Sequence, residues 1–310
     1  PERTLRMNAQ KMNRRQFIRT SAVAAAGTAL LSQWTIPSAF AAAIKRTATD
    51  QVTLGKTGIK LSRLGVGTGS ANGHEQTAVG KDAFIKMIHH AYDSGITYID
   101  CAERYQTFPW IADAIKGLPR EKLFIQSKVP GHPDDVLAAI DAHRKNFNVD
   151  YIDSLLIHCM TDDTWTDGYK KVMDGFNEAK EKKWIRAKGV SCHTIGALRA
   201  AVTTDWTETH LVRINPQGRY MDAAKSAWGP DVVADVDPVV EQIKSMHAKG
   251  HGVIGMKIFG NGDVKNPADR EKSIRFAMSK PEIDAIVIGF TTPAQIDEAI
   301  NKINSVLAEA

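Results

Sequence analysis

The sequence predicts an α/β protein: a single (β/α)8 TIM barrel, preceded by an N-terminal β-hairpin and a removable signal segment. Short apolar runs alternate with amphipathic stretches from residue 63 to residue 307, with the periods of strands and helices. Eight runs of each kind are present, which is the number that closes such a barrel. The composition, 43% hydrophobic and 24% charged over 310 residues, is typical of soluble globular proteins. It excludes collagen-like, disordered, coiled-coil and multi-span membrane chains.

The first element in chain order is a signal peptide. Arg14 and Arg15 precede a weakly apolar stretch, Ala22–Leu31, and small residues at Ala39 and Ala41 follow it, with the expected cleavage near Ala41 or Ala43. Basic, apolar and cleavage-site elements in this order are typical of secretory signal peptides, and the paired arginines resemble the twin-arginine export signal. The apolar stretch is about half as long as a bilayer-spanning helix, so the sequence predicts no stable membrane span. A permanent membrane helix and a basic amphipathic helix are the alternatives.

Cleavage near these alanines divides the chain into a signal peptide with a linker, residues 1–43, and a barrel, residues 44–310. The net charge of +5 belongs to the first part, whose charged residues are Glu2, Arg3, Arg6, Lys11, Arg14, Arg15 and Arg19. Without that part the net charge is close to zero, which argues against a nucleic-acid partner. We expect an exported, periplasmic protein whose partners are the export machinery and a small molecule.

The barrel begins with a hairpin over Gln51–Leu61, where Gly55 and Gly58 frame the turn. Eight apolar runs then predict the barrel strands. They are Leu64–Gly67, Tyr98–Cys101, Leu123–Ser127, Ser154–His158, Ala187–Ser191, Leu211–Asn215, Val253–Lys257 and Ala285–Ile288.

Amphipathic stretches between and after these runs predict the helices, several of which start with Asp or Thr-Pro as caps. They are Asp82–Asp93, Ile111–Ile115, Asp134–Asn146, Gly168–Lys183, Ile195–Thr203, Asp237–Lys249, Asp269–Met278 and Pro293–Leu307. A doubly wound open sheet is the competing fold. It usually has a Gly-rich turn and a helix directly after its first strand, whereas here Gly65, Gly67 and Gly69 lead into Asn72 and Gly73 with no immediate helix.

Residues that handle protons follow three consecutive strands. Asp100 and Tyr105 come at the end of the second strand, Lys128 at the end of the third, and His158 at the end of the fourth. Active sites of (β/α)8 barrels lie at the carboxyl ends of the strands, so we expect these side chains at one rim. Taken singly, each has a structural explanation, as a turn residue, a rim aromatic, a solvated charge or a core histidine.

The spacing of these residues resembles the aldo-keto reductase family. Its D-x-x-x-x-Y element matches Asp100 and Tyr105, and its strand-end Lys and His match Lys128 and His158. The similarity extends from Val52 to Leu307 and includes the segments GVSC, RINP, GMKIFG and IGFTTPAQIDEA. The resemblance implies NAD(P)H-dependent reduction of an aldehyde or ketone to an alcohol, a reversible reaction with Tyr105 as general acid and base.

This chemistry needs the residue types that the tetrad supplies. Hydride delivery to a carbonyl carbon builds negative charge on oxygen, so a proton donor must lie beside it. Tyr105 would be this acid, and the Lys128 ammonium would stabilise its phenolate. Asp100 would hold Lys128 by an ion pair, and His158 would orient the substrate oxygen.

The resemblance also implies a nicotinamide cofactor, which would carry the hydride. Ser191 would contact its carboxamide, Cys192 stands where the family usually has Asn, and Arg213 stands where it has Gln. Asn215 belongs to the same set, and Lys257, Phe259 and Gly260 belong to the loop beside the pyrophosphate. The residues implied for the far end of the cofactor are Gly289, Thr291, Gln295 and Glu298.

In the family that the sequence resembles, members selective for a 2′-phosphate often have cations at the positions of Gly289 and Gln295, and here neither residue is cationic. We expect NADP as the cofactor on family preference and on Lys257 nearby, with NAD as the alternative.

No metal site is expected. Cys101, Cys159 and Cys192 each follow a candidate site residue and are interpreted as small packing residues, although one disulfide with a spare thiol is the alternative. A metal site at Cys192 and His193 lacks the usual ligand spacing.

The competing function is a nicotinamide-nucleotide-binding regulatory or sensor protein with little turnover. Substrate identity and oligomeric state have no readable signal.

Overall fold

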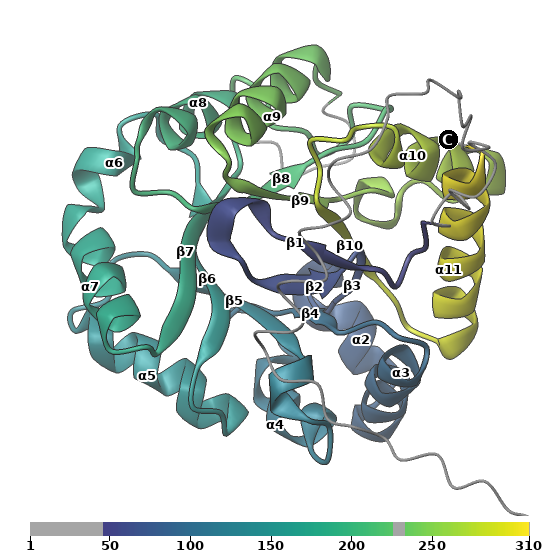
Figure 1. The fold of residues 1–310 in the computed structure, drawn as a ribbon, viewed down its shortest axis with the longest axis horizontal. Coiled ribbons are helices and arrows are strands. Elements are labelled where there is room, and N and C mark those ends of the chain that lie inside the picture. Colours follow the sequence, from purple (N-terminus) through teal and green to yellow (C-terminus); the bar gives the residue numbers. More distant parts are fainter. Residues whose placement is uncertain (1–45, 226–232, 310) are drawn as a thin grey trace, which may run out of the picture. The chain divides into compact units, whose positions relative to one another are not determined.

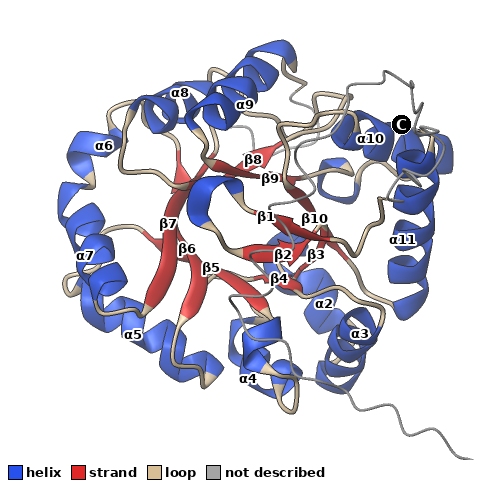
Figure 2. Ribbon diagram, viewed as in Figure 1, coloured by secondary structure: helices blue, strands red, loops and turns tan. Residues whose placement is uncertain are grey.

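The computed structural model describes residues 46–225 and 233–309. Its centre is a closed barrel of parallel strands in the order β10-β3-β4-β5-β6-β7-β8-β9, drawn in red in Figure 2 with the helices around it. The strands are β3 (Leu64–Gly67), β4 (Tyr98–Asp100), β5 (Phe124–Pro130), β6 (Ile152–Met160), β7 (Ile185–Cys192), β8 (Thr209–Arg213), β9 (Gly252–Met256) and β10 (Ala285–Gly289). The (β/α)8 barrel predicted from the sequence is confirmed.

Each strand is followed by at least one helix on the outside of the ring. The α-helices are α2 (His74–Ala78), α3 (Lys81–Asp93), α4 (Ile111–Ile115), α5 (Val136–Phe147), α6 (Trp165–Gly168), α7 (Lys170–Glu181), α8 (Ile195–Thr203), α9 (Asp237–Lys249), α10 (Pro267–Met278) and α11 (Pro293–Ala308). Short 3-10 turns are η1 (Gly55–Thr57), η2 (Ser70–Gly73), η3 (Phe108–Trp110), η4 (Arg120–Lys122) and η5 (Gly260–Gly262). Asp135, Thr194 and Thr292 accept hydrogen bonds from the first turns of α5, α8 and α11, and so define where these helices begin.

The hairpin closes one end of the barrel. Strands β1 (Gln51–Thr53) and β2 (Lys60–Ser62) pair antiparallel, and Figure 1 shows this segment lying across the ring. Leu54, Ile59 and Leu61 of the hairpin belong to the same buried cluster as side chains from inside the barrel, such as Tyr98 and Phe124. The hairpin is therefore a plug that completes the interior core at the end opposite the strands' carboxyl termini.

A second and larger core lies between the strands and the helices. Val66, Ile125 and Ile157 face outward from their strands and pack in one cluster with helix residues such as Phe84 and Phe176. The alternation of inward and outward side chains along each strand produces the two layers. The barrel rim is thus held from both sides, which fixes the positions of the side chains that follow each strand.

The structure corrects three details of the sequence prediction. The segment after β3 does contain helix, because η2 and α2 follow within a few residues. The helix predicted over 168–183 is α7, and a short helix that was not predicted, α6, precedes it; the two are separated at Tyr169, whose φ and ψ are −99° and 13°. Asn215 and Lys257 lie just beyond the ends of β8 and β9 instead of within them.

The predicted signal peptide over residues 1–43 lies outside the described residues. Among the helices that the structure does describe, none combines the length and the hydropathy needed to cross a bilayer.

Candidate active site

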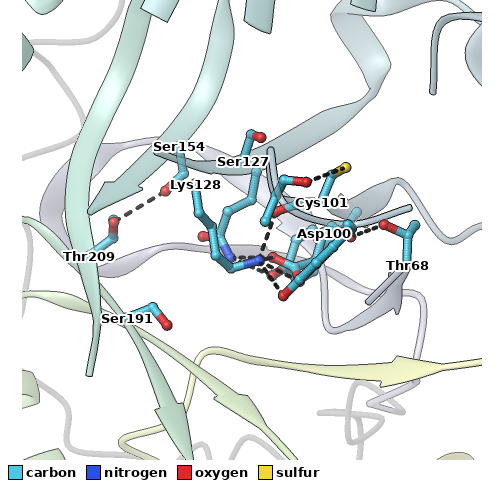
Figure 3. A network of polar contacts seen from close by, with 12 residues as sticks. Thr68, Asp100, Cys101, Ser127, Lys128, Ser154, Ser191 and Thr209 are labelled. Carbon is cyan, nitrogen blue, oxygen red and sulfur yellow. Dashed lines mark hydrogen bonds and ion pairs between the residues drawn. The ribbon is translucent and has the colours of Figure 1, made fainter. Parts of the chain in front are cut away.

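The carboxyl ends of β4, β5 and β6 bring the expected tetrad together. Asp100 is the last residue of β4, Tyr105 follows on the next loop, Lys128 lies in β5 and His158 in β6. Because these strands are parallel neighbours, their ends meet at one rim. Figure 3 shows Lys128 and Asp100 directed toward each other across adjacent strands.

Lys128 is held by a buried ion pair. Its Nζ atom donates to both Asp100 carboxylate oxygens, at 2.8 and 2.9 Å, and to the Cys101 carbonyl at 2.7 Å. The Gln126 amide donates to Asp100 Oδ1 at 2.9 Å. Burial is the largest single effect and lowers the pKa of Lys128, but the charges and hydrogen bonds of its neighbours, with the Asp100 carboxylate foremost, together outweigh burial, and the pKa lies above its ordinary value. Lys128 therefore stays an ammonium ion at neutral pH.

Tyr105 lies directly beside this ammonium. Its hydroxyl is 3.4 Å from Lys128 Nζ, which also lies 4.9 Å from the centre of the phenol ring. The ring packs against the backbone of Gly69, where an added Cβ would come within 2.2 Å of it. Burial raises the pKa of Tyr105 to about 12, and the positive charge of Lys128 offsets only part of that rise. The expected stabilisation of the phenolate is present, but burial is the larger effect, so the phenol is protonated at neutral pH.

His158 completes the group. Its ring centre is 5.8 Å from that of Tyr105 at an angle of 80°. Burial lowers the pKa of His158 well below its ordinary value, and the positive charges of Lys128 and Arg104 lower it further. The ring is therefore neutral at pH 7. Within the described part of the chain, the buried Nδ1 atom has no hydrogen-bond partner.

A bulge in β6 sets the direction of His158. The register between β6 and β7 shifts between Ile157 and Met160, and Cys159 has a φ of +63°, which is unusual for a residue other than glycine. The extra residue bends the strand at its end. His158 and Cys159 consequently both line the cavity, instead of alternating between the inside and the outside.

A cavity of about 650 Å³ opens above the tetrad. The candidate site residues in its wall are Asp100, Tyr105, His158, Ser191, Arg213, Lys257, Phe259, Gly289, Thr291 and Gln295. Lys128 lies beneath this wall, fully buried.

Among the described residues, three further candidates are, like Lys128, not part of the wall. Asn215 is buried and uses its amide to hold two loops, donating to the carbonyls of Arg219 at 2.7 Å and Lys257 at 3.1 Å. Gly260 lies in η5 with a φ of +52°. Glu298 lies on α11, 3.9 Å from Lys302. Their proposed contacts with a cofactor stay predictions.

The cavity wall at β7 and β8 is a polar cluster around His193. Ser191 Oγ lies 3.4 Å from His193 Nε2, and the Arg213 guanidinium is hydrogen-bonded to His193 Nδ1. Arg213 Nε is also 3.7 Å from Asp222 Oδ1. Burial raises the pKa of Asp222 to about 7, against the lowering effect of Arg213. The guanidinium is thus fixed in the wall by its neighbours.

The loop after β9 carries strained backbone and a buried amine. Lys257 and Asn261 have φ values of +58° and +56°, and Lys257 Nζ donates to Asn261 Oδ1 at 2.5 Å. Burial lowers the pKa of Lys257 to about 8, and the positive charge of Arg213 adds to this effect. The amine is therefore mostly charged at neutral pH and faces the cavity.

The packing around residue 289 leaves no room for a side chain. A Cβ at this position would come 2.0 Å from Ser70 Oγ, which accepts a hydrogen bond from the buried Gln76 amide at 2.9 Å. A cationic side chain at residue 289 would displace η2. This packing gives a physical reason for the absence of a cation at a position where the family resemblance implied one.

Sequence reasoning missed four basic residues of the cavity wall: Arg104, His193, Lys265 and Arg270. Arg104 immediately precedes Tyr105, and Lys265 and Arg270 follow the KIFGNG segment within ten residues. The Arg270 guanidinium lies 4.6 Å above the ring of Phe259. For Arg104, Lys265 and Arg270, the signal in the sequence is their short separation along the chain from these motifs.

The three cysteines are free in the structure. Cys101 and Cys192 are buried as packing residues, whereas Cys159 is partly exposed to the cavity. Cys159 Sγ lies 3.7 Å from His193 Nε2. Among the described residues, no three His, Cys, Asp or Glu side chains are arranged to hold a metal ion.

Comparison with known proteins gives similarity over most of the barrel. The model of the aldo/keto reductase family matches residues 63–273, and that of the twin-arginine translocation pathway signal sequence matches residues 11–30. The chain is 30% identical over 103 residues to an NAD/NADP-dependent indole-3-acetaldehyde reductase of Schizosaccharomyces pombe, covering 33% of this chain and 36% of that enzyme. It is 23% identical over 231 residues to a probable aldo-keto reductase 1 of Glycine max, covering 68% and 60%.

The first relatives are thus matched over about a third of their own length. Among solved structures, a putative aldo-keto reductase from Pseudomonas aeruginosa superposes with a TM-score of 0.67 at 20% identity, over 86% of this chain and all of that one. An aldo-keto reductase from Bacillus halodurans in its holo form gives a TM-score of 0.65 at 14% identity, over 84% and 96%. These structures share the fold. The family match over two thirds of the sequence establishes that the chain belongs to the aldo/keto reductase family, and the match at residues 11–30 establishes that it carries a twin-arginine signal sequence.

Proposed function

We propose that this protein reduces an aldehyde or ketone to the alcohol with NAD(P)H, reversibly, and that Tyr105 is the general acid and base. The observation that carries this proposal is the buried chain from Asp100 through Lys128 to the Tyr105 hydroxyl, which ends in the cavity beside His158. Each member has a side chain of the type that proton transfer to a carbonyl oxygen requires.

A nicotinamide nucleotide fits the cavity wall. Lys257, Lys265 and Arg270 offer cations to phosphate groups, and Gly67 and Gly289 leave room for close approach along β3 and β10. Ser191 and Arg213 offer polar groups near the tetrad. When bound, the nicotinamide supplies the hydride.

The chain's own residues would handle the proton. Tyr105 is protonated at neutral pH and would donate to the developing alkoxide, while Lys128 stabilises the phenolate that remains. The neutral His158 ring would donate a second hydrogen bond to the same oxygen. Asp100 keeps the ammonium in place throughout, because it accepts two hydrogen bonds from it. In the oxidative direction Tyr105 would take the proton back.

We propose NADP as the preferred cofactor and NAD as the alternative. The helices α10 and α11 pack side by side, and Arg270 and Gln295 lie in their first turns, both in the cavity wall. Arg270 and Lys265 would thus supply the charge that Gly289 and Gln295 lack.

Export by the twin-arginine route suggests that the protein works in the periplasm. We propose that residues 1–43 are the signal peptide and linker and that residues 44–310 are the working barrel. Its partners would be the export machinery and a small carbonyl substrate.

The test is the Tyr105→Phe variant, assayed for carbonyl reduction and titrated with cofactor by tryptophan fluorescence. We expect kcat to fall by roughly 10² to 10⁴, with the cofactor Kd changed less than about twofold, because the lost hydroxyl serves the reacting oxygen. Tyr92→Phe, on α3 and outside the cavity, is the matched control. Equal turnover in both variants would rule out the role of Tyr105. Cofactor binding without any turnover in the parent would favour a sensor.

A further inference from the structure

Arg104 is a cation of the cavity wall that has no partner among residues 46–225 and 233–309. Its side chain is exposed and lines the cavity. Within the described residues it makes no hydrogen bond, ion pair or ring contact, whereas Lys128 and Arg213 are both engaged by carboxylates. A guanidinium placed at a catalytic cavity with no internal partner is available to a ligand.

The neighbouring acids are directed elsewhere. Glu103 precedes Arg104 in the chain, but its carboxylate lies 3.3 Å from His143 Nε2, and His143 is in turn 2.9 Å from the buried Ser127 hydroxyl. Asp100 is occupied by Lys128. Glu75 lies near Gly262, where an added Cβ would be 3.6 Å from Glu75 Oε1. The acids in the described part of this rim therefore leave Arg104 uncompensated.

The tetrad end of the cavity is accordingly positive. The charge of Arg104 acts on His158 and on Cys159, together with the charges of Lys128 and Lys257. It also acts on Tyr169, between α6 and α7. Arg104 thus borders the space in front of Tyr105 and His158, which is where a substrate carbonyl must lie if the tetrad is to reach its oxygen.

The backbone keeps Arg104 at this point. Tyr105 N donates to the Ala102 carbonyl at 3.0 Å, and Glu103 N donates to the Lys128 carbonyl at 3.2 Å. The turn that presents Tyr105 therefore also fixes the Cα position of Arg104 relative to the tetrad. Only the side-chain torsions of Arg104 are free to adjust to a ligand.

We propose that Arg104 binds an oxyanion group, a carboxylate or a phosphate, carried by the carbonyl substrate. The proposal rests on the proposed reductase function and narrows its substrate to anionic aldehydes or ketones. A guanidinium can bind either group through two parallel hydrogen bonds. Specificity would come from charge at the rim, while the tetrad acts on the carbonyl.

The kinetic test compares aldehydes of one scaffold in the parent, Arg104→Gln and Arg199→Gln proteins. Arg199 is an exposed arginine on α8 outside the cavity wall, and serves as the matched control. The carboxylate pair is 4-formylbenzoate and its neutral methyl ester; the phosphate pair is 4-formylphenyl phosphate and neutral 4-methoxybenzaldehyde. In the parent and in Arg199→Gln we expect kcat/KM to favour the anionic member of at least one pair.

In Arg104→Gln the ratio of kcat/KM for the anionic to the neutral aldehyde should fall by roughly 10- to 100-fold. The pair that shows the fall identifies carboxylate or phosphate as the group that is bound. An unchanged ratio for both pairs overturns the proposal, even if every variant is active.

A binding experiment at equilibrium distinguishes failure of the Arg104 proposal from failure of the proposed reductase function. Binding of terephthalate and of phenyl phosphate is measured by calorimetry with NADP present, so that phosphate-binding cations elsewhere in the cavity are occupied. Loss of binding in Arg104→Gln alone supports the anion site whether or not any aldehyde is reduced. Absence of turnover in the parent would count against the reductase function only. Equal anion binding by all three proteins would overturn the role of Arg104.

Discussion

At the scale of single residues, the cations of the cavity fall into two groups, those that form an ion pair with a carboxylate of the protein and those that do not. Lys128 and Arg213 are buried beside Asp100 and Asp222 and are therefore structural or catalytic cations. Arg104 and Lys265 make no such pair within the described residues, and Arg270 contacts the face of Phe259. The unpaired cations lie in the cavity wall, so they are the groups available to bind anions.

The cofactor preference can be tested at two of these residues. We expect Arg270→Gln and Lys265→Gln to raise the Kd for NADPH by roughly 10- to 100-fold, because each removes a charge-assisted hydrogen bond to the 2′-phosphate. The Kd for NADH, which lacks this phosphate, should change much less. Fluorescence titration of each variant with both nucleotides measures the effect, and Lys272→Gln, further along α10, is the control. A parallel loss for NADPH and NADH would place the two cations at another part of the cofactor.

The proximity of the four tetrad residues could be predicted from sequence, whereas the role that we propose for Arg104 could not. Asp100, Lys128 and His158 follow apolar runs, and the order of runs in a parallel barrel places their ends together. Whether Arg104 has a partner depends on where Glu103 points, and the contact of Glu103 with His143 on α5 is not encoded by local spacing. A single sequence does not show which side chains of different helices, strands and loops contact one another.

At the scale of elements, loops and caps explain most differences between prediction and structure. Apolar runs define where strands exist, but β6 continues to Met160 through a bulge that no run of residues indicates. The segment 168–183 contains Tyr169, which is compatible with helical periodicity but separates α6 from α7. The hairpin, by contrast, was predicted from two glycines at its turn, of which Gly58 has a φ of +72°.

The hairpin plug depends on one carboxylate. Asp284 Oδ2 accepts from Gly55 N of the hairpin at 3.1 Å and from Val253 N of β9 at 2.9 Å. Burial raises the pKa of Asp284, and these two hydrogen bonds lower it again only in part. The folded state therefore binds the Asp284 proton more tightly than the unfolded chain does, and this residue's contribution to stability falls as the pH rises through its pKa.

We expect Asp284→Ala to lower the free energy of unfolding by about 2 kcal/mol at pH 7, because it leaves two backbone N–H groups without an acceptor. Asp284→Asn keeps an acceptor oxygen and removes the buried charge, so its effect should be less than half as large. Urea denaturation of both variants gives the comparison. Equal losses would show that the charge, and not the acceptor, holds the hairpin.

At the scale of the whole molecule, the charge and the fold belong to different parts of the chain. The net charge of +5 is carried by residues 1–43, which also include the whole region matched by the signal sequence model. The contacts of the chain form a separate compact unit from Lys45 to Ala310, and every residue assigned here to catalysis or ligand binding lies in it. Export and chemistry are therefore expected to be separable.

A chain that starts at Ile44 should fold and bind cofactor like the full-length protein. It keeps the hairpin, the barrel and the complete cavity wall, and it loses no described contact. We expect its midpoint of urea denaturation and its Kd for NADPH to match those of the full chain within error. Its isoelectric point should fall from about 9.0 toward neutrality, because the removed segment holds six Lys or Arg residues against one Glu. A shorter chain that binds cofactor weakly would instead mean that part of residues 1–43 belongs to the working fold, and the domain boundary would have to move toward the N-terminus.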